Sequence, residues 1–281
     1  MLAVYGLVNF LHRSADHRKE EGKELMNVHF LGYTGSIQHA GSANVSLVVE
    51  EGREVVLVDV SGAPVMEMLK AGIDPRDLKT VLITHSHIDH IYALPSLIHQ
   101  LWLMGRAEPL VIVGNRETIS KARELCSLFG LEQKNRMFPL VWKILENGVY
   151  GSLAGQLRLT VFPVPHGVPT VGCVFESAHG KVAYFADCTA DVAYPEVAYD
   201  ADLLIHEAGG LCEDSAILAG KGHSSSRQAA EAARMLRAGR LVLCHLPSEV
   251  SMYQLMLAEA QAVFKRTELP VLYKAYGCEK V

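Results

Sequence analysis

The chain has 281 residues, of which 49% are hydrophobic and 20% are charged, as is usual for a folded globular protein. This length allows one large α/β domain with a sizeable core. The net charge of −5 argues against the broad basic surface of most nucleic-acid-binding proteins. The six cysteines form no CxxC pair, which argues against a disulfide framework in a chain of this length. No apolar run approaches the roughly 20 residues of a membrane span. The N-terminal stretch lacks the basic start and the cleavage site of a secretory signal peptide. We therefore expect a cytoplasmic protein without a membrane partner.

The first half of the chain moves from an irregular start into an alternation of strands and helices. Residues 1–27 are polar over much of their length and show no core pattern, and we expect them to form an N-terminal extension before one domain over residues 28–281. Turn-rich GSIQHAGSAN separates the first two of the strands that follow. The pattern predicts strands over 28–33, 45–50, 54–60, 79–84 and 110–113, and helices over 64–71, 93–104 and 116–129.

The second half is rich in strands and then returns to the alternation. Residues 137–185 contain several apolar segments between glycine and proline residues, which is typical of strands. Ser224, Ser225 and Ser226 offer an N-cap for a helix. The tail predicts strands over 202–206 and 241–244 and helices over 226–236 and 253–266. These elements together favour an α/β fold with two mixed β-sheets back to back and helices on their outer faces.

The segment TVLITHSHIDHIYAL carries the strongest functional pattern. An apolar strand leads into His85, His87, Asp89 and His90, four potential metal ligands within six residues. Imidazole and carboxylate groups are the ligands that zinc takes in hydrolytic sites, and manganese and iron also accept them. Burial of three imidazoles and a carboxylate without a cation would cost desolvation energy and leave polar groups unpaired. The HxHxDH pattern therefore predicts a metal centre.

This pattern resembles the metal-binding signature of the metallo-β-lactamase superfamily, whose fold is a four-layer αβ/βα sandwich. The later motifs of that family have counterparts here, each at the end of an apolar strand: His166 in FPVPHGVPTVG, Asp187 in VAYFADCTA and His245 in RLVLCHLPS. The resemblance implies two divalent metal ions. It assigns His85, His87 and His166 to one ion, and Asp89, His90 and His245 to the other, with Asp187 shared.

The chemistry that the resemblance implies is hydrolysis by water between two metal ions. Such water loses a proton near neutral pH, and the ions offset charge on a phosphate or acyl oxygen. We expect zinc in both positions, with manganese or iron as alternatives. Asp89 is counted among the catalytic residues as well as among the ligands.

Two further segments resemble the ribonuclease Z branch of the superfamily. In ADLLIHEAGG and GHSSSRQAAEAARMLRAGRLVLCH, Glu207 and His223 stand where that branch has a Glu–His pair. The resemblance implies that His223 donates a proton to the leaving oxygen, which a phosphodiester hydrolase needs because an unprotonated alkoxide leaves poorly. His206, next to Glu207 on a strand, is expected to face away and to be structural.

The chain also departs from ribonuclease Z. Bacterial members carry a long arm for the tRNA elbow between the third histidine and the shared aspartate, whereas twenty residues separate His166 from Asp187 here. The Arg-Tyr pair that usually follows the last histidine is replaced in HLPSEVSMY. We therefore predict a phosphodiesterase that acts on a small phosphodiester or ester in preference to nucleic acid.

Several alternatives stay open at this point. The chain could be a lactone or carboxylic-ester hydrolase on the same fold, or a tRNA 3′-processing endoribonuclease. A non-catalytic metal-binding protein is a further alternative, and a diiron flavoprotein is disfavoured because those relatives have Glu where His87 stands. A homodimer is conceivable through an exposed apolar face of helix 93–104.

Overall fold

The computed structural model describes residues 25–145, 148–154 and 157–278, with side chains over 25–145 and 157–278. The predicted extension lies mostly outside these residues; its last part is described, and the first strand begins at Met26. The strands are β1 (Met26–Gly32), β2 (Ser46–Glu51), β3 (Glu54–Val58), β4 (Thr80–Leu82), β5 (Leu110–Gly114), β6 (Leu140–Ile144), β7 (Gly148–Ala154), β8 (Leu157–Val164), β9 (Thr170–Glu176), β10 (Lys181–Phe185), β11 (Leu203–Glu207), β12 (Leu241–Cys244), β13 (Thr267–Glu268) and β14 (Ala275–Cys278). The α-helices are α2 (Pro64–Lys70), α3 (Ile88–Ile91), α4 (Leu94–Leu103), α5 (Arg116–Ser127), α6 (Ser215–Gly220), α7 (Ser226–Met235) and α8 (Tyr253–Val263).

The strands form two seven-stranded mixed sheets, ordered β14-β1-β2-β3-β4-β5-β6 and β13-β12-β11-β10-β9-β8-β7. In the first sheet β1, β2 and β3 pair antiparallel, and β3 to β6 pair parallel. In the second, β7 to β10 are antiparallel and β10 to β13 parallel. This arrangement confirms the predicted pair of mixed sheets.

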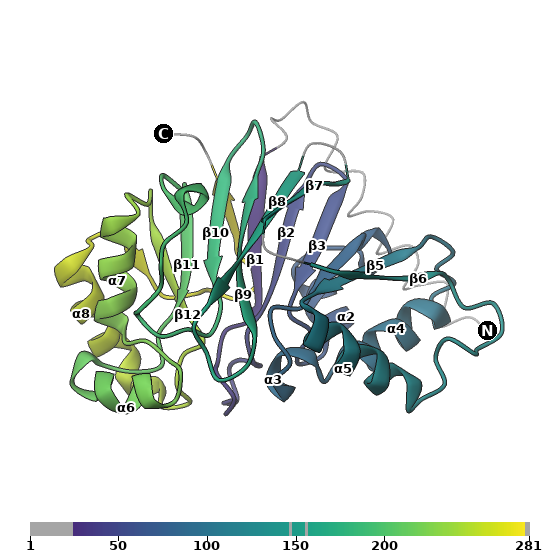
Figure 1. Ribbon diagram of the computed structural model, residues 1–281, viewed down its shortest axis with the longest axis horizontal. Coiled ribbons are helices and arrows are strands. Elements are labelled where there is room, and N and C mark those ends of the chain that lie inside the picture. The colour runs from purple at the N-terminus through teal and green to yellow at the C-terminus, as the bar shows by residue number, and fades with distance from the viewer. Residues whose placement is uncertain (1–24, 146–147, 155–156, 279–281) are drawn as a thin grey trace.

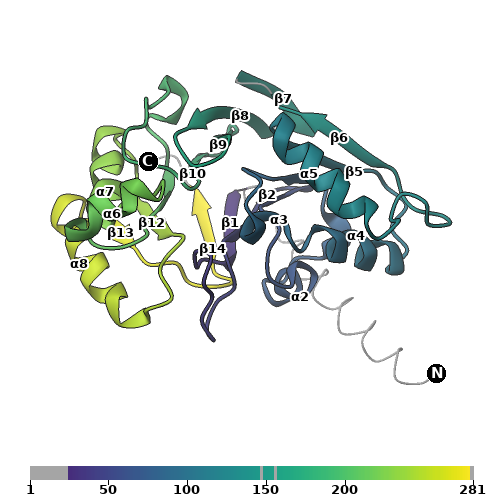
Figure 2. The same ribbon diagram turned by 60° about the horizontal axis from the view of Figure 1, so that its bottom comes forward.

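The sheets pack face to face, with helices on both outer sides (Figures 1 and 2). A central core that includes Phe30 and Tyr184 joins the two sheets. A second core lies under α2, α4 and α5, and a third under α7 and α8. The layers are therefore helix, sheet, sheet and helix, as the resemblance implied. In the part of the chain that the structure describes, no helix has both the length and the apolar character needed to cross a membrane.

Local capping explains where two of the helices begin. The Asn115 side chain accepts a hydrogen bond from the Thr118 N–H at the start of α5. At α7, Ser225 and Gln228 form a capping box, which confirms the cap expected among the three serines.

Several predicted elements differ from the observed ones in their bounds or exposure. The strand predicted over 54–60 ends at Val58, because Asp59 adopts a left-handed backbone with φ 58°. The helix predicted over 253–266 ends at Val263, where Phe264 turns extended before β13. The helix predicted over 93–104 buries most of its apolar face in the core beneath α4, whereas Leu103 and Met104 at its end are exposed.

Candidate metal centre

The predicted ligands meet at the carboxyl edge of parallel strands. His85 and His87 follow β4, and Asp89 and His90 lie on α3. The other three ligands each follow a strand of the second sheet: His166 after β8, Asp187 after β10 and His245 after β12. Strands that run in one direction deliver their end loops to one edge, so residues up to 160 positions apart in the chain become neighbours.

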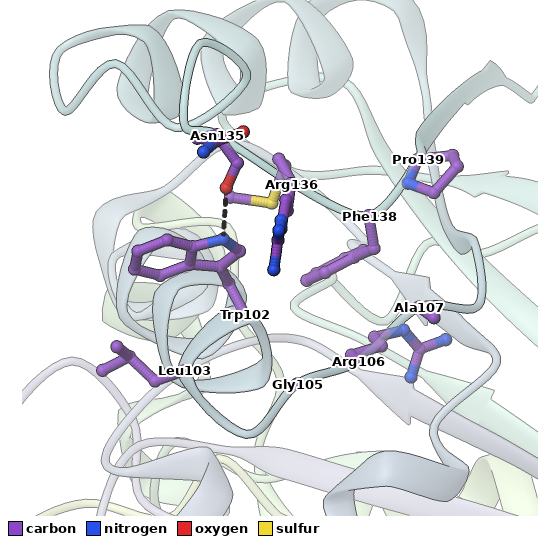
Figure 3. A pocket seen from close by; sticks show the side chains of 10 residues that line it. Trp102, Leu103, Gly105, Arg106, Ala107, Asn135, Arg136, Phe138 and Pro139 are labelled. Atoms are coloured by element: carbon purple, nitrogen blue, oxygen red, sulfur yellow. Dashed lines mark hydrogen bonds between the residues drawn. The ribbon is translucent and has the colours of Figure 1, made fainter.

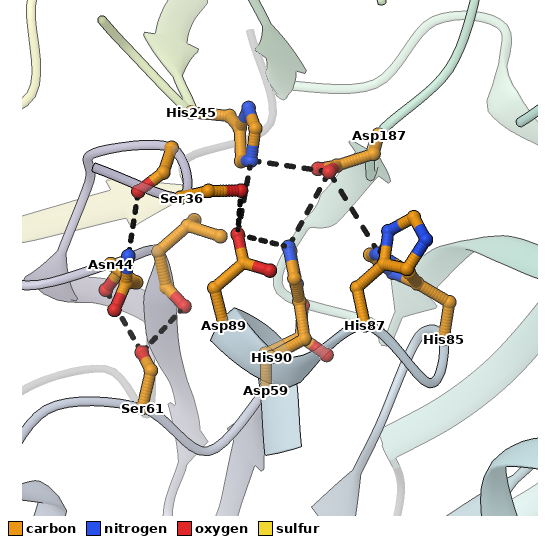
Figure 4. Close-up of polar contacts among 12 residues, drawn as sticks. Ser36, Asn44, Asp59, Ser61, His85, His87, Asp89, His90, Asp187 and His245 are labelled. Atoms are coloured by element: carbon orange, nitrogen blue, oxygen red, sulfur yellow. Dashed lines mark hydrogen bonds and ion pairs between the residues drawn. The ribbon is translucent and has the colours of Figure 1, made fainter. Parts of the chain in front are cut away.

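The structure brings the seven residues into two groups. The first ligand group contains His85, His87, His166 and Asp187, and the second contains Asp89, His90 and His245. Within each group the ligand atoms lie within 4.8 Å of one another. Figure 4 shows Asp89, His90, Asp187 and His245 directed toward a common point.

In the first ligand group three imidazole nitrogens converge. His87 Nδ1 lies 3.1 Å from His85 Nε2 and 3.1 Å from His166 Nε2. Ligand nitrogens about 2.05 Å from a tetrahedral ion lie roughly 3.3 Å apart, so this spacing fits zinc. Burial lowers the pKa of all three histidines, which favours the neutral form that ligates metal.

Asp187, a member of the first ligand group, also faces the histidines of the second. Its Oδ2 is 3.8 Å from His85 Nε2, 3.5 Å from His90 Nε2 and 3.1 Å from His245 Nε2. Burial would raise the pKa of Asp187, but the charges of the surrounding histidines outweigh it and hold the pKa well below the usual value. A buried carboxylate kept ionised among histidines is suited to share cations.

Unpaired polar atoms in the cluster provide a test of whether the residues fit a metal. His90 Nε2, Asp187 Oδ1 and His245 Nε2 are buried and form no hydrogen bond, and the two nitrogens have only ion-pair contacts with Asp89 and Asp187. Buried polar atoms are rarely left unpaired, because each costs desolvation energy. Divalent cations would satisfy these atoms, so the residues fit metal ions.

Asp59 supports the second ligand group, and the sequence interpretation missed it by extending a strand through it. This fully buried carboxylate lies 2.8 Å from His90 Nδ1 and accepts hydrogen bonds from the Thr84 N–H and hydroxyl. Its left-handed backbone, in VDVSG after an apolar strand, turns the chain toward the site. An outer carboxylate of this kind orients a metal-binding histidine and raises its basicity.

His223 and Glu207 form the predicted pair beside the ligands. His223 Nδ1 lies 3.1 Å from Glu207 Oε1, and the same oxygen accepts a hydrogen bond of 2.6 Å from the Cys188 N–H. The His223 ring stacks on His245 with centroids 5.0 Å apart. Burial lowers the pKa of His223, but the hydrogen bond and charge of Glu207 outweigh burial and raise it above the ordinary value. The buried His206 instead stacks on Phe185.

A separate hollow lies between the end of α4 and the segment before β6. Its volume is about 650 Å³, and it is lined by Trp102, Arg106, Arg136 and Phe138 among others (Figure 3). Arg106 donates there to the carbonyls of Glu108 and Pro109. This hollow contains none of the predicted site residues.

Comparison with known proteins identifies the family. Residues 56–246, more than half of the chain, match the model of the beta-lactamase superfamily domain. The chain belongs to this family, and this confirms the predicted class: a metal-dependent hydrolase of the metallo-β-lactamase fold.

Individual relatives and structures are similar over nearly the whole chain. Ribonuclease Z of Methanothermobacter thermautotrophicus is 28% identical over 87% of this chain and 94% of its own length, and ribonuclease Z of Bacillus cereus is 27% identical over 89% and 99%. The metallo-beta-lactamase fold protein YhfI from Bacillus subtilis is 22% identical and covers 91% of this chain and 100% of its own, with a TM-score of 0.76. Human tRNase Z, short form, is 21% identical over 89% and 98%, with a TM-score of 0.74.

The relatives also carry residues that this chain lacks. The Bacillus cereus alignment spans 304 positions and 99% of that protein, but takes in 89% of the 281 residues here. Several dozen residues of the relative therefore have no counterpart. In this chain the segment between His166 and Asp187 is filled by β9 and β10, whose turn closes with a 3.0 Å hydrogen bond from Ser177 N–H to the Gly180 carbonyl.

Proposed function

We propose that this protein is a phosphodiester hydrolase that works with two divalent ions. The preferred ion is zinc, with manganese or iron as alternatives. The observation that carries the proposal is the position of the His223–Glu207 pair directly beside the two ligand groups, where Asp187 Oδ2 lies within 3.8 Å of His85 Nε2, His90 Nε2 and His245 Nε2. A proton donor is needed for poor leaving groups such as an alkoxide, and phosphodiesters have such leaving groups.

The ligands divide between the two ions as the groups suggest. His85, His87 and His166 would hold one ion, and Asp89, His90 and His245 the other, with Asp187 between them. When bound, such ions supply a nucleophilic water at neutral pH and offset negative charge on the substrate.

The remaining steps belong to side chains of this protein. Glu207 holds His223 through Nδ1, which fixes the ring orientation and favours the protonated imidazole. A ring nitrogen of His223 lies within 4.8 Å of ligand atoms of Asp187 and His245, so a substrate seated there would be within its reach. His223 would therefore donate its proton to the leaving oxygen, and Glu207 would stabilise the charged ring before transfer.

We propose a small phosphodiester as the substrate class. The short β9–β10 turn supports this choice, because no arm rises between His166 and Asp187 to hold a large RNA. The net charge of −5 also disfavours a polyanionic partner.

A second candidate is tRNA 3′ processing. It is favoured by the similarity to ribonuclease Z over 94–99% of the relatives' length. Against it stand the residues that the relatives have and this chain lacks.

The test combines metal analysis with a substrate panel. We expect purified protein to contain up to two ions and to hydrolyse bis(p-nitrophenyl) phosphate and a dinucleoside monophosphate. His223→Ala should lower kcat/KM for the dinucleoside by about 100-fold or more, but by less than about tenfold for the p-nitrophenyl ester, whose leaving group needs no proton. His99→Ala, a half-buried histidine on α4, serves as control.

Other outcomes separate the alternatives. Faster cleavage of a tRNA precursor with a 3′ trailer than of any small ester would favour the second candidate. Turnover of lactones without any phosphodiester turnover, unaffected by His223→Ala, would overturn the proposal in favour of a lactone hydrolase.

A further inference from the structure

We propose that Gly35 and Ser36, in the loop after β1, position Asp89 and His245 and thereby set the affinity of the second ligand group for its ion. This inference rests on the proposed two-ion centre. It assigns a role to a loop that lies outside the ligand motifs and joins parts of the site delivered by different sheets.

The loop is anchored firmly beside the site. The Gly35 N–H donates to the Leu246 carbonyl over 2.8 Å, and Thr34 forms isolated β-bridges with Leu246 and Asn44. The Asn44 amide, which is 2% exposed, donates to the Gly35 carbonyl over 2.6 Å. Both backbone polar groups of Gly35 are therefore paired, and the loop is held against the residue that follows His245.

Ser36 acts on the carboxylate of the second ligand group. Its hydroxyl donates to Asp89 Oδ2 over 2.8 Å (Figure 4). The same oxygen lies 3.7 Å from His90 Nε2 and 3.7 Å from His245 Nε2, so it is the atom directed at the ion position. A hydrogen bond on this oxygen restricts rotation of the carboxylate and keeps the ligand atom in place.

Gly35 acts on the imidazole of the second ligand group. A Cβ on this residue would lie 2.9 Å from His245 Cε1 and 3.1 Å from Nδ1, closer than side-chain carbons normally approach. The backbone of Gly35 does not have a positive φ, so packing rather than chain conformation requires glycine here. The ring of His245 can occupy its position because the loop presents no side chain.

A hydrogen-bond network keeps the rest of the loop in register. Gln38 Nε2 donates to Asn44 Oδ1 over 2.5 Å and to the Tyr92 hydroxyl over 3.0 Å. Ser61 donates to the carbonyl of Asn44 over 2.9 Å (Figure 4). The network reaches Tyr92, the residue directly after α3, and the Gly35–Leu246 hydrogen bond attaches the same loop to the segment that follows β12.

The experiment measures metal binding rather than activity. Protein stripped with a chelator is titrated with Co²⁺, and the visible absorption of bound cobalt is followed to two equivalents. We expect Ser36→Ala to weaken the second equivalent about tenfold and Gly35→Ala about 100-fold, with the first equivalent unchanged. Ser36→Thr keeps the hydroxyl and should restore wild-type binding. Ser96→Ala, an exposed serine on α4, is the matched control.

Each outcome decides the inference. If Ser36→Ala and Gly35→Ala bound each of the two equivalents with the same affinity as the wild type, the inference would be overturned and the two-ion centre would stay intact. Failure of the wild type to bind a second equivalent would remove the inference together with the proposed centre. Loss of both equivalents in Ser36→Ala, with failed rescue by Ser36→Thr, would mean a general folding defect and would also overturn it.

Discussion

The two ligand groups are held in different ways. In the first, His166 Nδ1 lies 2.9 Å from the carbonyl of Gly222, and His85 Nδ1 lies 3.0 Å from the Thr84 hydroxyl. In the second, His90 is held by the carboxylate of Asp59, and Asp89 by the hydroxyl of Ser36. Neutral partners thus support one group, and a buried carboxylate supports the other.

This difference has an electrostatic consequence. Burial lowers the pKa of His85 and His166, whereas Asp187 and Asp59 overcome the burial of His90 and raise its pKa. The second ligand group therefore has more negative charge around His90, and the raised pKa of His90 depends on this charge. Metal affinity there should therefore respond more strongly to changes in outer residues.

The largest effect is expected for Asp187→Ala, which removes the carboxylate that we propose both ions share. Hydrolysis should fall by at least about 1,000-fold, because neither ion would keep its shared ligand. Metal analysis should show loss of both ions. Retention of two ions and of activity would contradict the role of Asp187 as a ligand shared by the two ions.

Asp59→Asn sharpens the comparison at the second ligand group. Asparagine also tolerates the left-handed backbone at this position, so the change mainly removes charge from the partner of His90. We expect the second ion to bind about 10- to 100-fold more weakly and the first to be little affected. The control is Asp200→Asn, an exposed aspartate with φ 57°. Calorimetric titration with Zn²⁺ measures the affinities of the two ions. An unchanged affinity for the second ion would refute the role of Asp59.

Gly222→Ala probes the first ligand group. A Cβ there would lie 2.7 Å from His166 Nδ1, and the backbone has φ 84°. We expect weaker binding of the first ion by about tenfold, since the ring must move. Gly105→Ala shares the positive φ, at 77°, but its Cβ would meet nothing within 4 Å. If both variants lose the same stability and neither loses metal affinity, backbone strain alone explains the glycine.

The smallest effect is expected for Lys121→Ala at the exposed edge of the first ligand group. Lys121 Nζ contacts Glu117 and the hydroxyl of Ser86, which stands between His85 and His87. The Lys121–Glu117 pair is largely exposed. The free energy of unfolding, measured by thermal denaturation, should therefore change by less than about 1 kcal/mol, and metal affinity by less than about threefold. A larger loss of the first ion would show that this group too depends on charged outer residues.

Sequence by itself determined the fold class and singled out the residues that we propose as ligands. Apolar strands that end in His, Asp or Glu carry their own signal, because buried strands and metal ligands both restrict residue type. That is why the HxHxDH segment, His166, Asp187 and His245 could be proposed before any geometry. The α/β alternation likewise predicted most helices and strands to within a few residues.

Tertiary structure alone decided the outer partners of the site. Asp59, Gly35, Ser36 and Gly222 are common residue types in turns, and nothing in their local sequence states which ligand they contact. Their roles arise from long-range pairing: Ser36 and Asp89 are 53 positions apart, and His166 and Gly222 are 56 apart. The burial of most of the apolar face of α4 was likewise decided by tertiary structure, because the sequence of an apolar helix face does not reveal whether another layer covers it.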